Sequence, residues 1–119
     1  MPLIFSYGSL QEEAVQLSIY GRVLSGEADA LHGWVRTRIE VPKWHKAASS
    51  GTTHYANIEC SPQSASRVAG TLLELTDAEL EASDGYERDA EYVRTMITLE
   101  SGRRAWVYVS AGTVSNIER

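Results

Sequence analysis

The stretch LIFSYGSLQEEAVQLSIYG, residues 3–21, places a short apolar strand directly before a turn and a polar, helix-forming segment. Residues 3–5 are typical of a buried strand, and Gly8 interrupts it because glycine accepts backbone angles that other residues avoid. From residue 11 onward the composition favours a helix, with Gly21 as its stop signal. Such a turn leaves consecutive backbone N–H groups aimed at one point, which suits a carboxylate or a developing oxyanion.

Beyond this stretch, short apolar runs alternate with turn-forming residues. Strand-like composition marks five further segments, 31–41, 53–60, 66–75, 91–99 and 104–111. Gly70, inside the third of them, predicts a bulge or a close approach of two backbones. The last two are joined by Glu-Ser-Gly-Arg and predict a hairpin. The residues of the hairpin expected to face the core are Val93, Ile97 and Leu99.

The strongest helix signal covers residues 76–87. Thr76 and Glu79 form a capping box at its start, and Gly85 is the expected left-handed terminator. Because strands mostly follow strands, the order of elements favours a mixed or antiparallel sheet over a doubly wound parallel one. We therefore predict an α+β fold, a small mixed or antiparallel β-barrel with two or more short helices, formed as a single domain by residues 1–119.

Composition restricts the class of protein. Eleven basic and sixteen acidic residues give a net charge of −5, which argues against nucleic-acid binding because phosphate neutralisation needs clustered Lys and Arg. Cys60, the sole cysteine, excludes an intramolecular disulfide and fits a reducing cytoplasm. The first ten residues lack the features of a signal peptide, and no apolar run is long enough for a membrane helix.

One acidic residue has a local sequence that suits proton transfer. Glu87 lies close to the end of the predicted helix, whose carbonyl end carries partial negative charge. Asp84, Asp89 and Glu91 surround it, so its pKa should be raised, especially with burial, although Arg88 would oppose this if it turns the same way. A carboxyl tuned in this way can accept and return a proton near neutral pH. The alternative is a solvated acid in an acidic loop.

Other reactive side chains have weaker patterns. Ser9 or Cys60 paired with His54 would make a nucleophile and base, yet neither lies in a recognisable nucleophile signature. Cys60 on a strand is more often a small, buried apolar residue. The three histidines, including His32 and His45, lack the close spacing of metal ligands, so we predict no metal site.

The motifs occur together in a recognisable order. They are Tyr-Gly-Ser-Leu at 7–10, VAGTLLEL at 68–75, Asp-Gly-Tyr-Glu at 84–87, Tyr-Val-Arg at 92–94 and AWVYV at 105–109. In this order and spacing, which span nearly the whole chain, the sequence resembles the gamma-glutamylcyclotransferase-like superfamily. Members with known activity release 5-oxoproline from gamma-glutamyl compounds, by attack of the substrate's own alpha-amine on its gamma-carbonyl.

The resemblance implies a role for individual residues. Glu87 matches the family's catalytic glutamate and would act as general acid and base. The positions that match substrate-binding residues are Tyr7, Gly8, Ser9, Leu10, Tyr92 and Tyr108. The reaction needs no metal or organic cofactor, and the expected partner is a small gamma-glutamyl molecule, bound by a cytoplasmic monomer or homodimer.

Two features depart from the family pattern. Arg88 stands where many relatives have glycine, and the polar loop at 42–54 matches nothing recognisable, although it could shape the mouth of a pocket. Since a shared scaffold does not guarantee turnover, a non-catalytic protein of the same fold that binds a small ligand remains the alternative.

Overall fold

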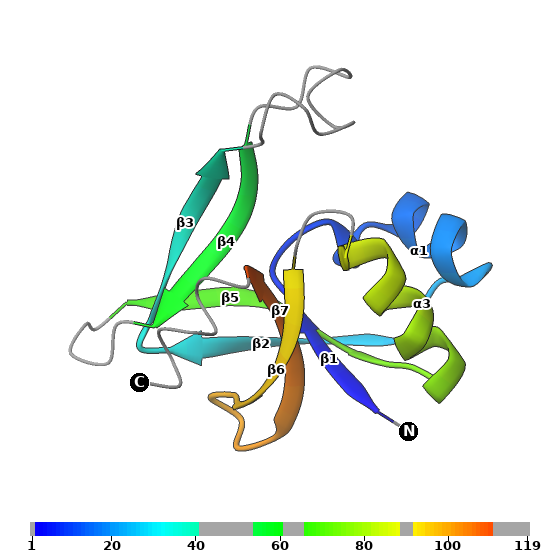
Figure 1. Ribbon diagram of the computed structural model, residues 1–119. Coiled ribbons are helices and arrows are strands. Elements are labelled where there is room, and N and C mark those ends of the chain that lie inside the picture. Colours follow the sequence, from blue (N-terminus) through cyan, green and yellow to red (C-terminus); the bar gives the residue numbers. More distant parts are fainter. Residues whose placement is uncertain (1, 41–53, 61–65, 89–91, 111–119) are drawn as a thin grey trace.

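The computed structural model describes residues 2–40, 54–60, 66–88 and 92–110. Within them lie seven strands, two α-helices and one short 3₁₀ helix (Figure 1). In chain order these are β1 (Leu3–Ser6), η1 (Ser9–Gln11), α1 (Glu13–Tyr20), β2 (Gly26–His32), β3 (Trp34–Glu40), β4 (His54–Cys60), β5 (Arg67–Glu74), α3 (Asp77–Arg88), β6 (Tyr92–Thr98) and β7 (Arg104–Ser110). None of the helices in these ranges is long and apolar enough to cross a membrane.

Five strands form one sheet in the order β2-β5-β1-β7-β6. Strands β1 and β7 run parallel and the other neighbours antiparallel, so the sheet is mixed, as predicted. Strands β3 and β4 form a separate hairpin that rises away from the sheet, while α1 and α3 pack side by side at the other side of the molecule (Figure 1). The hairpin contacts β5 and β7, and the α+β class predicted from the sequence is confirmed.

The two faces of the five-stranded sheet bury different apolar clusters. Alternate residues of a strand point to opposite faces, so neighbours such as Ile4 and Phe5 enter different clusters. On one face, Phe5, Leu72 and Val107 pack with Trp34 and Ile58 of the β3–β4 hairpin. On the other, Ile4, Leu73 and Tyr108 pack with Leu10 and with Val15, Ile19 and Leu80 of the two helices. The alternation therefore separates a hairpin side from a helix side.

Several local predictions are confirmed by hydrogen bonds and backbone angles. The N–H of Thr76 donates to Oε1 of Glu79 at 2.9 Å, and the N–H of Glu79 donates to Oγ1 of Thr76 at 3.1 Å, which is the capping box. Gly21 ends α1 with a left-handed φ of 73°. A Cβ on Gly70 would lie 2.3 Å from the carbonyl oxygen of Ser6, so only glycine lets β5 approach β1 this closely.

The predicted boundaries of two elements were wrong. Residues 26–32 form β2, of which the sequence analysis assigned only the last two to a strand. Helix α3 continues through Gly85 to Arg88, and Gly85 does not have the left-handed φ that would end a helix. A glycine inside a helix costs only about 1 kcal/mol, which contacts of the last turn can offset.

Two side-chain expectations were also wrong. Val93 is 40% exposed because β6 is an edge strand of the sheet, whereas Leu99 is buried and Ile97 partly buried, as predicted. Cys60 is exposed at the end of β4. Gly8 has a φ of −135° and a ψ of −140°, which belong to neither the helical, the extended nor the left-handed region. The loop that departs from the family pattern lies mostly at 41–53, outside the described residues.

Candidate active site

The chain bends directly after β1, at residues 7–10, and this bend lies against the last turn of α3. The hydroxyl groups of Ser9 and Tyr86 are hydrogen-bonded at 2.9 Å, which joins the bend to the residue immediately before Glu87. The Tyr7 hydroxyl donates to the carbonyl oxygen of Tyr108 at 2.7 Å. Two residues that are 101 positions apart in the chain are thereby fixed together, and the bend is anchored to both α3 and β7.

Arg36 of β3 supports the bend from the other side. Its Nη1 donates to the carbonyl oxygen of Tyr7 at 3.0 Å, and its Nη2 donates to the carbonyl oxygen of Ala69 at 2.9 Å. One guanidinium therefore bridges the bend and β5. Sequence reasoning placed Arg36 only within the strand-like segment 31–41 and gave it no role.

Two consecutive amides of the bend have no acceptor within the part of the chain that the structure describes. The carbonyl oxygen of Tyr7 is taken by Arg36, and the N–H groups of Ser9 and Leu10 make no hydrogen bond to any described residue. Leu10 is only 3% exposed and anchors η1 in the core. Such a pair of amides is chemically able to hold a carboxylate or an oxyanion.

Glu87 lies in the last turn of α3 and is partly buried. Burial raises the pKa of its carboxyl to about 7. The direction agrees with the sequence analysis, and among the described groups the cause is loss of water around the carboxylate, the burial that the sequence analysis named beside the neighbouring acids. Burial is the first cause that raises the pKa of Tyr7, Tyr20 and Tyr108, and the charge of Glu87 adds a smaller contribution to each, so the carboxylate acts electrostatically on all three side chains.

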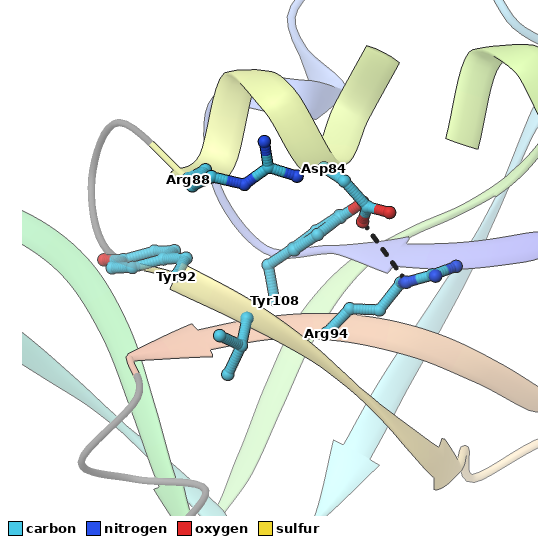
Figure 2. A pocket seen from close by; sticks show the side chains of 6 residues that line it. Asp84, Arg88, Tyr92, Arg94 and Tyr108 are labelled. Carbon is cyan, nitrogen blue, oxygen red and sulfur yellow. Dashed lines mark hydrogen bonds and ion pairs between the residues drawn. The ribbon is translucent and has the colours of Figure 1, made fainter. Parts of the chain in front are cut away.

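A hollow of about 210 Å³ lies beside Tyr108 (Figure 2). The described residues that line it are Asp84, Arg88, Tyr92, Val93, Arg94 and Tyr108. Tyr108 donates its hydroxyl to Oδ1 of Asp84 at 2.7 Å, and Nε of Arg94 lies 3.2 Å from the same oxygen. Neither Glu87 nor any residue of the bend is among the described residues that line this hollow.

The structure thus brings together most of the residues that the sequence analysis singled out. Tyr92 and Tyr108 line the hollow, Tyr7, Ser9 and Leu10 form the anchored bend, and Glu87 lies near Tyr7 and Tyr108. Of the alternative nucleophiles, Ser9 bonds to Tyr86 and Cys60 is exposed, while the side chain of His54, the base considered for either of them, lies outside the described part of the structure.

The sequence analysis missed the roles of Asp84 and Arg94 in the hollow and the buried hydroxyl pair below it. Tyr20 of α1 and Ser83 of α3 are hydrogen-bonded through their hydroxyls, and Ser83 also donates to the carbonyl oxygen of Glu79. Asp84 had been considered only as a charge near Glu87. An i, i+4 pattern of polar residues on the inner face of α3 was the only signal for the hydroxyl pair.

Solved structures of other proteins have a similar fold. Two solution structures of Arabidopsis thaliana proteins match 94% of the chain, at 24% identity with a TM-score of 0.70 and at 23% identity with a TM-score of 0.71. A structure named gamma-glutamyl cyclotransferase matches 92% of the chain at 16% identity with a TM-score of 0.64. The chain spans 63%, 70% and 66% of the length of these three proteins, respectively.

No curated protein matches the chain closely. The sequence profile of one family matches almost all of it, over residues 4–118, and this range includes the bend, α3 and all seven strands except the first residue of β1. The family is described as gamma-glutamyl cyclotransferase, AIG2-like. By this match and by its fold, the chain belongs to the gamma-glutamyl cyclotransferase, AIG2-like family.

Proposed function

We propose that this protein releases 5-oxoproline from a small gamma-glutamyl amino acid or gamma-glutamylamine, with Glu87 as general acid and base. The observation that carries the proposal is the position of Glu87, a carboxyl whose pKa burial raises to about 7, on the turn of α3 that is bonded to the bend, where two amides have no acceptor among the described residues. A carboxyl with a pKa close to the working pH is well matched to both halves of a proton transfer.

The chemistry divides between Glu87 and the bend. The alpha-amine of the substrate reaches the site as an ammonium ion, and Glu87 takes one proton so that the nitrogen can attack the gamma-carbonyl carbon. A new C–N bond closes the five-membered ring, and the bond from that carbon to the leaving nitrogen breaks. Glu87 returns the proton to the leaving nitrogen, and the ring nitrogen gives up its second proton to the departing amine, so that the products are 5-oxoproline and a protonated amine.

The remaining barrier falls because the reaction is intramolecular. Holding the glutamyl chain in a curled conformation replaces a bimolecular encounter by an internal one. The N–H groups of Ser9 and Leu10 are available to bind the alpha-carboxylate or the oxyanion of the tetrahedral intermediate. If they bind the oxyanion, each is worth about 3 kcal/mol. Tyr7, Tyr92 and Tyr108 would orient the substrate, and Gly8 would let it approach the bend, because a Cβ there would meet no other atom within 4 Å.

The test is an assay of 5-oxoproline release from gamma-glutamyl amino acids, gamma-glutamylamines and glutathione. Glu87→Gln keeps the shape of the side chain but removes the base, so it should abolish turnover. Glu81→Gln, on an exposed face of the same helix, is the matched control and should be as active as the wild type. Full activity of Glu87→Gln would overturn the mechanism.

The same assay addresses the non-catalytic alternative. A protein that only binds would form a complex with one of these compounds, measurable by calorimetry, without releasing 5-oxoproline from any of them. In that case Glu87 would contribute to affinity alone, and the proposed turnover would be wrong.

A further inference from the structure

The hollow beside Tyr108 is built from three elements and has a small, defined volume. Its described lining comes from the last turns of α3 and from the facing parts of β6 and β7 (Figure 2). At about 210 Å³ it is smaller than the roughly 300–1,000 Å³ of sites for drug-sized ligands. Its size therefore suits a group no larger than one small amino acid.

The charges of the lining do not cancel. The Asp84 carboxylate accepts a hydrogen bond from Tyr108 at 2.7 Å and pairs with Arg94 at 3.2 Å. Arg94 is held further by the face of the Trp106 ring, 4.4 Å from its guanidinium carbon. These contacts neutralise Asp84 and Arg94 against each other. The hollow is left with the charge of its remaining cation, Arg88.

Arg88 makes no hydrogen bond or ion pair with any residue in the described ranges. Its guanidinium lies on the far side of the Tyr108 ring from Arg94 (Figure 2). An unpaired guanidinium beside an aromatic ring is suited to bind a carboxylate, because its planar N–H groups match two carboxylate oxygens. The described lining thus selects for an anion and against an ammonium group.

We propose that this hollow receives the leaving part of the substrate and that Arg88 binds a carboxylate on it. The inference rests on the proposed function, in which Glu87 must protonate the leaving nitrogen. Arg88 follows Glu87 directly in α3, and the charge of Glu87 also reaches Tyr108, which forms one wall of the hollow. A leaving group that extends from Glu87 into the hollow therefore brings its carboxylate to Arg88, which makes Arg88 a determinant of specificity.

The decisive experiment compares gamma-glutamyl-alanine with its C-terminal amide, which has the same shape but no carboxylate. The wild type should prefer the acid about tenfold in kcat/KM, as expected for one charge-assisted hydrogen-bonded contact at a partly exposed site. Arg88→Gln should remove this preference, mainly by raising KM for the acid. Arg88→Lys should retain part of it, and Arg104→Gln, an exposed arginine at the other end of β7, should retain all of it.

Equilibrium binding separates this inference from the proposed function. Calorimetry of the Glu87→Gln protein with the acid and the amide measures the preference for a carboxylate without turnover. If the wild type releases 5-oxoproline from neither compound, the proposed function fails. If the acid nevertheless binds more tightly than the amide, and Arg88→Gln removes this difference, the carboxylate site stands. Equal binding of acid and amide, or equal losses for both in Arg88→Gln, would overturn the carboxylate site.

Discussion

The two ends of α3 hold glutamates with opposite properties. Glu79, in the first turn, accepts two hydrogen bonds from the guanidinium of Arg22, and this ion pair and the cap at Thr76 lower its pKa to about 2 despite some burial. Glu87, two turns later, is partly buried without a described cation against it, and burial raises its pKa to about 7. The same side chain on the same helix is thus stabilised as an anion at one end and as a neutral acid at the other.

This difference shows which physical quantity marks a proton-transfer group. Both carboxyls lie on an amphipathic helix among polar residues, so composition alone does not separate them. What separates them is the balance between a paired cation and lost hydration. A structural carboxylate has its charge compensated, whereas a carboxyl available for acid–base chemistry has its water removed and its charge left uncompensated.

The largest expected effect is on turnover and concerns Glu87, the second glutamate of this comparison. Glu87→Gln should lower kcat by about 10²- to 10⁴-fold, the usual contribution of one acid–base group. In the wild type, kcat/KM should rise with pH and level off above about pH 7, because the base is active only when deprotonated. A pH–rate profile measures both features. A flat profile between pH 5 and 8 would contradict the assignment of Glu87 as base.

The raised pKa of Glu87 should also change the free energy of unfolding with pH, which can be measured without any substrate. The folded pKa of Glu87, about 7, exceeds the reference value of 4.5, so the native state binds more protons between these pH values and its stability falls as pH rises through them. At pH 8, Glu87→Gln should therefore be more stable than the wild type by roughly 2 kcal/mol, after allowance for remaining solvent contact. Urea unfolding at pH 4 and pH 8 tests this, and an equal difference at both would count against it.

The contribution of Glu79 to stability should depend on pH in the opposite direction. Glu79 has a folded pKa of about 2 against a reference of 4.5, so its contribution to stability is present above pH 4.5 and is lost as pH falls toward 2. Glu79→Gln keeps an acceptor for the cap but removes the ion pair with Arg22, and should destabilise the protein by about 1 kcal/mol at pH 7. Unfolding at pH 7 measures the loss, which 1 M salt should reduce.

The smallest effect concerns the link between the bend and the last turn of α3. Ser9→Ala and Tyr86→Phe each remove the hydroxyl contact of 2.9 Å, and their coupling should be about 0.5–1 kcal/mol in a double-mutant cycle of unfolding. Because the contact holds Glu87 near the bend, the same variants should raise KM for a gamma-glutamyl substrate. Strictly additive losses would mean that the two hydroxyls do not cooperate.

Features that depend on nearby residues could be predicted from the sequence. The capping box of Thr76 and Glu79, the stop at Gly21 and the last hairpin each involve residues close together in the chain, and each is present. The close approach at Gly70 also left a local trace, since glycine is otherwise unfavourable in a strand. The candidate residues of the bend and Glu87 came from a motif order, and their chemical roles remain predictions.

Other features depended on packing between distant segments. Helix α3 passes through Gly85, and its last turn gains a contact with the bend. Val93 is exposed because no described segment covers that part of the edge strand β6. Both errors came from reading local propensity where tertiary contacts outweighed it. Arg36 was missed for the same reason, since its two acceptors come from the bend and from β5.

The sequence by itself determined where strands alternate, where α3 begins and which motifs follow one another, because hydrogen bonding and side-chain periodicity act within a few residues. Only the tertiary structure decided that Glu87 loses its water, and that Arg88 lines a hollow shared with β6 and β7 without a partner among the described residues. Desolvation and charge balance are sums over neighbours that come from distant parts of the chain, so no single segment encodes them.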